Sequence, residues 1–275
     1  MGLWIFLSRA KEKTSRPYIR LIRRIMILAI VGLIHQLIQP GEALLVYAIM
    51  GIPVLFFGKI PKQINLALGI VGIIIGSIVG AKLLLTFPLM LLGLAFGQYR
   101  IFERCNAERK IWLITLVLSF IATTILSVYL WESTPEYGAV SFIEGTELTE
   151  LQIESNRAFY QFVDLSLAFA PFFSVFYVSF LVVIDPLANK LLSPLNAFGR
   201  MAFTNYIGQS ILLFLIAMLM TSEVIVSYTF ATITCAIVVV FQVIVSSFWL
   251  KYFKYGPLEW IWRCGTYGTW LSIKR

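Results

Sequence analysis

Eight long apolar runs, separated by short polar breaks, constrain this chain more than any other feature of its sequence. The runs are residues 25–39, 43–57, 64–81, 83–99, 111–130, 159–184, 201–220 and 226–250. Each is long enough, or nearly so, to cross about 30 Å of hydrocarbon as a helix. Only 13% of the residues are charged, about half the share in ordinary soluble domains. We therefore predict an all-α, polytopic transmembrane helix bundle of about eight spans.

The positions of the basic residues orient these spans. With the N-terminus in the cytoplasm, only Lys82 and Arg157 of the 22 Lys and Arg residues fall on the outer side. Basic residues accumulate in loops that are not translocated. The distribution therefore predicts that both termini are cytoplasmic and that the protein is a multi-pass protein of the bacterial inner membrane. The net charge of +8 is then an orientation signal, and we expect the lipid bilayer, not nucleic acid, as partner.

The chain is expected to form a single transmembrane domain over residues 1–275, because no linker or long repeat divides it. The longest outer loop, residues 131–158, is acidic. Three cysteines without CxxC spacing and a single histidine, His35, offer no Cys/His metal site. We expect neither a metal nor a permanently bound cofactor. In the third run Gly72, Gly76 and Gly80 recur every four residues, which allows a neighbouring helix to approach closely.

Ionisable side chains inside a membrane are costly, and those that occur are the first candidates for function. His35 lies in the outer half of the first run and Asp164 in the outer part of the sixth. Glu42 lies in the turn between the first two runs. We predict His35 and Asp164 as catalytic residues, with Asp164 orienting His35 and stabilising its protonated form, and Glu42 as a substrate-binding residue.

Arg24 stands eleven residues before His35, so on one helix the two side chains share a face about 16 Å apart. Arg24 could bind the phosphate of a cytoplasmic donor, while His35 acts as general base toward a hydroxyl or amine. This reading requires that the His35 ring face a cleft continuous with the basic cluster below. The alternative is that Arg24 is an interfacial anchor and His35 a hydrogen-bonded packing residue.

The seventh run begins with polar residues on two adjacent helix faces. Thr204 follows Arg200 by four residues, and Gln209 follows Asn205 by four, so this helix is not expected to face lipid. Arg200, Asn205 and Gln209 either line a substrate-binding donor pocket or hydrogen-bond to neighbouring helices.

The residues of this run carry a family resemblance. Residues 200–206 (Arg-Met-Ala-Phe-Thr-Asn-Tyr) with Gln209 and Ser210, followed by residues 256–260 (Gly-Pro-Leu-Glu-Trp) with Trp262 and Arg263, resemble the signature of the bacterial YeiB-type membrane proteins, the domain of unknown function 418. The first hairpin, residues 23–51, is similar to that family's helix, turn, helix pattern. The resemblance spans nearly the whole chain.

That family is grouped with transmembrane acyltransferases in which a basic residue, separated by ten intervening residues from a histidine, marks the active helix. The resemblance implies that Arg24 and His35 are the matching residues, and that an acyl group passes from acyl-CoA, as co-substrate, to an acceptor at or beyond the membrane. Some members have been described as involved in transport. A membrane transporter or exporter of a small molecule, with Asp164 and His35 on the substrate path, is therefore the alternative.

Two departures from the family pattern stand out. The family has Asp where this chain has Glu42. Relatives also begin with additional spans, whereas this chain starts at Met1 with a segment resembling the end of a preceding helix. The resemblance thus implies that N-terminal helices are missing, supplied by a second chain or a homo-oligomer, or that the chain is an inactive truncated paralogue.

Overall fold

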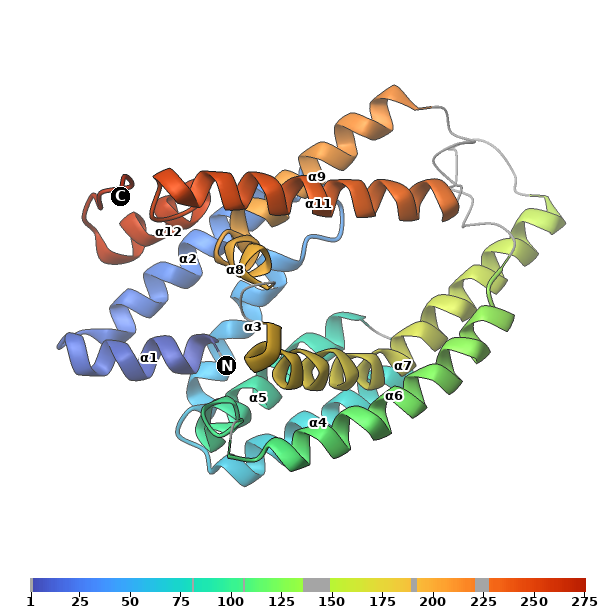
Figure 1. The fold of residues 1–275 in the computed structure, drawn as a ribbon, viewed down its shortest axis with the longest axis horizontal. Coiled ribbons are helices and arrows are strands. Elements are labelled where there is room, and N and C mark those ends of the chain that lie inside the picture. The colour runs from blue at the N-terminus through green and yellow to red at the C-terminus, as the bar shows by residue number, and fades with distance from the viewer. Residues whose placement is uncertain (1, 81, 106, 136–148, 189–191, 221–227) are drawn as a thin grey trace.

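The computed structural model describes residues 2–80, 82–105, 107–135, 149–188, 192–220 and 228–275 (Figure 1). These ranges form eleven α-helices, one short 3₁₀ helix and one isolated β-bridge, Phe253–Lys274. The helices are α1 (Gly2–Lys13), α2 (Pro17–His35), α3 (Ala43–Phe57), α4 (Lys62–Val79), α5 (Lys82–Tyr99), α6 (Arg109–Glu132), α7 (Glu150–Ala188), α8 (Ser193–Arg200), α9 (Ala202–Leu219), α11 (Tyr228–Tyr252) and α12 (Pro257–Tyr267), with η1 (Ile101–Glu103) between α5 and α6. The all-α prediction is confirmed.

Each of the eight predicted runs coincides with a helix, although two sets of bounds differ by more than two residues. The helix of the first predicted run, α2, begins at Pro17 and ends at His35, so the expected range of residues 25–39 is wrong at both ends. Proline suits the first turn of a helix, and the chain reverses over residues 36–41, where Gly41 has a φ of 87° that suits glycine. Helix α7 begins at Glu150, which makes the loop predicted at 131–158 shorter; its residues 136–148 lie outside the described part.

Glycines bring α4 and α5 into an antiparallel pair. A Cβ built on Gly72 would lie 2.5 Å from Cγ of Pro88, and one built on Gly76 would lie 2.6 Å from Cδ2 of Leu85. The partner's number falls as the glycine's number rises, so the helices run in opposite directions. The expected close approach along this glycine stripe is confirmed.

Small polar residues join two further antiparallel pairs. Between α6 and α7, the hydroxyls of Ser119 and Ser179 lie 3.4 Å apart. Between α9 and α11, the Asn205 amide donates to the Ser246 hydroxyl at 2.9 Å. The two pairs lie on different sides of the molecule in Figure 1. Such bonds are favoured between helices in lipid, where few other partners exist.

Apolar side chains cover the outside of the bundle. Leu37, Phe56 and Ile78 are each more than 70% exposed, while Asn65, Ser179 and Ser246 are fully buried. Water would disfavour this distribution, whereas hydrocarbon favours it. Among the described residues, five helices are long and apolar enough to cross a membrane: Lys62–Val79, Arg109–Glu132, Glu150–Asp185, Ala202–Leu219 and Thr229–Tyr252. The eight spans and their orientation stay predictions.

The N-terminal segment forms a helix of its own, α1, packed against α2 and α5. Leu7 of α1 is buried in one cluster with Leu21 and Ile25 of α2 and Ala48 of α3. This packing brings α1 beside the first part of α2, where the arginines lie.

Candidate functional site

His35 and Glu42 form a buried pair at the turn between α2 and α3. His35 is the last residue of α2, and Glu42 is the N-cap of α3. The short turn between the two helices returns the chain so that Nδ1 of His35 pairs with Oε2 of Glu42. The two residues are 2% and 4% exposed. The helix–turn–helix segment thus places an imidazole against a carboxylate inside the bundle.

The second carboxylate oxygen of Glu42 is held by two donors. The backbone N–H of Leu44 donates to Oε1 at 2.5 Å, and the hydroxyl of Tyr206, on α9, donates to it at 3.2 Å. The Tyr206 ring also packs against the imidazole, with the ring centroids 5.5 Å apart. An N-cap carboxylate is stabilised by the helix dipole as well as by its hydrogen bonds. Glu42 is therefore fixed from three directions as a hydrogen-bond acceptor.

The contacts of His35 indicate which nitrogen carries the proton. Nε2 is buried and has no hydrogen-bond partner in the described part of the protein. A protonated ring would bury an unpaired, charged N–H at that position, which costs more than an unpaired lone pair. We therefore assign the neutral ring with its proton on Nδ1, shared with Glu42. The free lone pair on Nε2 is the chemical requirement for a general base.

The predicted partnership of His35 with Asp164 is not present in this structure. Asp164 is exposed on α7, and its carboxylate lies beside Gly80, at the end of α4, where a Cβ would come within 2.9 Å of Oδ1. Glu42 occupies the orienting position instead. The spacing of seven residues across a Pro-Gly turn could have indicated this pair, whereas Tyr206, although part of the quoted 200–206 motif, had no sequence signal that linked it to Glu42.

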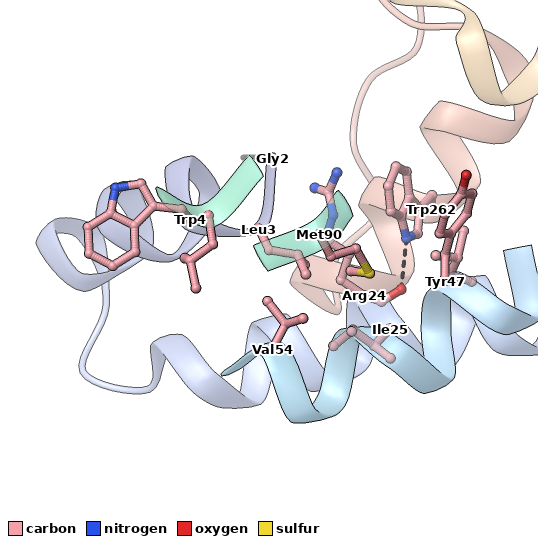
Figure 2. A pocket seen from close by; sticks show the side chains of 12 residues that line it. Gly2, Leu3, Trp4, Arg24, Ile25, Tyr47, Val54, Met90 and Trp262 are labelled. Carbon is pink, nitrogen blue, oxygen red and sulfur yellow. Dashed lines mark hydrogen bonds between the residues drawn. The ribbon is translucent and has the colours of Figure 1, made fainter. Parts of the chain in front are cut away.

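Arg24 lies between two aromatic rings. Its Cζ is 3.7 Å from the centroid of a Trp262 ring and 4.9 Å from that of Phe6, within the range of cation–π contacts. The indole N–H of Trp262 also donates to the backbone carbonyl of Arg24 at 3.0 Å (Figure 2). Helix α12 thus fixes Arg24 from the C-terminal end of the chain.

Two adjoining cavities meet at Arg24. One, of about 370 Å³, is basic and is lined by residues of α1, α2 and α12; the other, of about 280 Å³, is mostly apolar and is lined by α1, α2, α3, α5 and Trp262. His35 lines neither cavity. The expected cleft that joins the His35 ring to the basic cluster is therefore not open in this structure, in which the ring is enclosed.

The predicted polar residues at the end of α8 and in α9 mostly bond to the protein itself. Arg200 donates to the carbonyl of Lys254 at 3.0 Å. Asn205 bonds Ser246 of α11, and Gln209 is exposed. None of the three lines the two cavities at Arg24. For Arg200 and Asn205 the contacts agree with the alternative of bonding within the protein.

The two C-terminal sequence motifs meet in space. Glu259 accepts hydrogen bonds from the backbone N–H of Phe203 at 2.7 Å and of Thr204 at 3.0 Å, and from the Thr204 hydroxyl at 2.5 Å. A carboxylate of α12 thereby satisfies free donors at the start of α9. A Cβ on Gly256 would collide with this carboxylate, which explains the glycine. The motifs therefore join α9 to the helix that carries Trp262.

Fold and site together define a helical membrane protein. Its helix α2 carries both the imidazole of a buried carboxylate–imidazole pair and an arginine that lines two cavities. Residues 96–269 match the family described as a protein of unknown function, DUF418. The chain belongs to this family, as the resemblance predicted.

Two relatives carry names that describe them as uncharacterized. The chain is 38% identical over 277 residues to an uncharacterized 39.9 kDa protein in the amylase 3′ region of Bacillus acidopullulyticus, with 99% of this chain and 78% of that protein covered. It is 27% identical over 328 residues to the uncharacterized protein YxaH of Bacillus subtilis (strain 168), with 100% of this chain and 78% of that protein covered. No solved structure matches the chain.

Proposed function

We propose that this protein is a multi-pass acyltransferase of the bacterial inner membrane. It takes an acyl group from acyl-CoA, bound through its phosphates at Arg24, and passes it to a hydroxyl or amine acceptor at or beyond the membrane. His35 acts as the general base, and Glu42 replaces Asp164 as the residue that orients it.

The observation that carries the proposal is the His35–Glu42 pair with a free Nε2. A histidine held at Nδ1 by a carboxylate keeps its other nitrogen aimed and unprotonated, which is the arrangement that hydrolases and transferases use to activate a nucleophile. A histidine that served only packing would gain by bonding through both nitrogens, because a buried unpaired polar atom costs about 1–3 kcal/mol.

The transfer step uses the pair as follows. The acceptor O–H or N–H gives its proton to Nε2 of His35 while its oxygen or nitrogen attacks the thioester carbonyl carbon. A new C–O or C–N bond forms and the C–S bond breaks. The proton then passes from His35 to the departing thiolate. Glu42 stabilises the imidazolium that exists between these two proton transfers.

The enclosed ring adds a requirement to the proposal. Donor and acceptor must both reach Nε2, and His35 is 2% exposed. Tyr206 of α9 contacts both His35 and Glu42. The reaction therefore requires α9 to move relative to the α2–α3 hairpin when substrates bind, and also requires the donor to extend about 16 Å along α2 from Arg24.

Membranes that contain the protein provide the test. Acetyl-CoA labelled in its acyl group is supplied, and the label transferred to the envelope fraction is measured together with the thiol released. His35→Ala is expected to lower both by at least about 100-fold, the usual range for a general base, with insertion and abundance intact; thermal stability falls as well, because Glu42 loses its buried partner. Transfer at the wild-type rate by His35→Ala refutes the proposal, as does the absence of transfer from acetyl-CoA and longer acyl-CoA donors.

A transport function lacks a comparable observation. The path predicted for it depends on His35, Asp164 and the polar face of α9, yet neither His35 nor Asp164 lines the two cavities at Arg24. Uptake of a small molecule into proteoliposomes without any acyl donor would favour it.

A further inference from the structure

The lining of the basic cavity contains four arginines and no negative charge to balance them. Arg9, Arg20, Arg24 and Arg263 all line it, and its lining contains no Asp or Glu. Within the described part of the protein, none of the four forms an ion pair with a carboxylate. Like charges gathered beside a low-dielectric interior repel one another. An anion from outside the protein is the natural counter-charge.

Aromatic rings hold three of these guanidinium groups by their faces, since Cζ of Arg263 lies 4.5 Å from the centroid of the Tyr255 ring. Besides the contacts of Arg24 with Phe6 and Trp262, Cζ of Arg20 lies 5.4 Å from the centroid of the Tyr267 ring. A guanidinium stacked on a ring keeps the N–H groups at its edge available, in the planar arrangement that suits phosphate oxygens. The cavity therefore presents oriented donors for a phosphate group.

The adjoining cavity has the opposite character. Leu3, Ile25, Val54 and Met90 are among the side chains that line it (Figure 2), and Arg24 and Trp262 form the wall that it shares with the basic cavity. A Cβ on Gly51 would meet Leu3 and Met90 at 3.7 Å, an ordinary contact. The missing side chain at Gly51 thus keeps open a space whose surroundings suit a hydrocarbon chain.

We propose that the two cavities form one initial binding site for an amphiphile, whose phosphate head lies among the arginines and whose alkyl or acyl chain lies against Gly51; for an acyl donor, this site is occupied before the thioester reaches His35. The inference rests on the proposed function where it takes the amphiphile to be the acyl donor. The same chemistry is offered by a soluble acyl-CoA and by an anionic phospholipid of the bilayer. With either source, the phosphate head and the chain of one molecule must occupy the two cavities at the same time.

Binding to the purified full-length protein in phosphatidylcholine nanodiscs tests the inference without turnover. The probes are CoA, which has the head alone, and acetyl-CoA and octanoyl-CoA, which add chains. Each buried methylene is expected to tighten binding about fourfold until the cavity is full. Arg20→Gln weakens all three probes by about tenfold, whereas Arg23→Gln, which removes a charge from α2 outside the cavity, leaves them within about twofold.

Substitution at Gly51 separates the chain from the head. Gly51→Leu fills the apolar cavity and is expected to weaken octanoyl-CoA by at least about tenfold while CoA binding stays unchanged, which also shows that the variant is folded. Gly51→Ala, whose methyl group makes only ordinary contacts, gives a smaller loss of the same kind. Equal affinity for CoA and octanoyl-CoA in the wild type, or loss of CoA binding in the folded Gly51→Ala variant, overturns the inference.

A second arm identifies the source of the amphiphile. In nanodiscs that contain phosphatidylglycerol, native mass spectrometry measures the lipid retained by the protein. Retention that is lost in both Arg20→Gln and Gly51→Leu, without octanoyl-CoA binding, assigns the site to a bilayer lipid. Absence of binding in both arms overturns the inference. Binding of both head and chain without acyl transfer would refute the proposed function alone. Acyl transfer whose rate is unchanged by substitution of Gly51 would refute this inference alone.

Discussion

Replacement of Glu42 by glutamine tests the assigned protonation of His35 directly. The side-chain oxygen of the introduced amide can still accept from Leu44 N–H and Tyr206 Oη–H, which keep their roles as donors. The amide nitrogen then faces Nδ1 of His35, and two donors oppose each other. The conflict is relieved when the ring proton moves to Nε2. That N–H would be buried without an acceptor, because Nε2 has no partner in the described structure.

Two magnitudes follow from this change. One unpaired buried N–H costs about 1–3 kcal/mol of unfolding free energy. Acyl transfer is expected to fall on the order of 10⁴-fold, as occurs when the carboxylate that orients a catalytic histidine becomes an amide. Glu103→Gln is the matched control, since Glu103 is exposed and forms only a surface pair with Arg100 at 3.7 Å; we expect a change within about 0.5 kcal/mol.

The assay uses the fact that His35 is the only histidine of the chain. Protein labelled with ¹⁵N-histidine gives the signals of one imidazole, whose two nitrogens report which of them carries the proton. The wild type is expected to show the Nδ1–H form and Glu42→Gln the Nε2–H form, with unfolding followed in parallel in detergent. A wild-type ring protonated on Nε2, or a variant with an unchanged tautomer, would show that our reading of the pair is wrong.

Three further predictions concern the packing that supports the site. Glu259→Ala removes the acceptor at the start of α9 and should lower the unfolding free energy by about 1–3 kcal/mol in detergent denaturation, with Glu103→Ala nearly neutral. Gly72→Leu should disrupt the contact with Pro88, where even a Cβ would overlap, and cost about 1–3 kcal/mol, whereas Gly199→Ala, with nothing within 4 Å, should not. Asn205→Leu leaves Ser246 without its interhelical partner, and thermal unfolding should show that the unfolding free energy falls by about 1–3 kcal/mol. An unchanged unfolding midpoint in any of these three variants would contradict the contact that the variant removes.

The sequence was sufficient to predict the eight long apolar helices, because their main determinant is local. Apolar length decides whether a segment forms a membrane helix, so all eight predicted runs coincide with helices. The end of α2 was missed because Leu37 and Ile38 are apolar residues that follow after the helix has stopped. The glycine stripe of α4 was also readable, since helical periodicity alone puts Gly72 and Gly76 on one face.

The site was only partly predictable because its contacts join distant segments. His35 and Arg24 were found from the cost of ionisable groups near hydrocarbon, and that cost also singled out Glu42 and Asp164. Which carboxylate meets His35 depends on how the turn closes, and depth in the membrane could not distinguish them. The contacts of Tyr206 with Glu42 and of Trp262 with Arg24 span 164 and 238 residues, and no spacing rule covers such distances.

The contact of Trp262 with Arg24 also has a consequence for the order of biosynthesis. A ribosome makes Arg24 long before Trp262, so the wall between the two cavities is incomplete until residue 262 has been made. Until α12 emerges, the arginines of α2 lack their indole neighbour and α9 lacks the carboxylate that holds its first turn. The proposed ligand site can therefore form only after α12 has been made, and a message truncated shortly before the codon for Trp262 would yield the preceding helices without it.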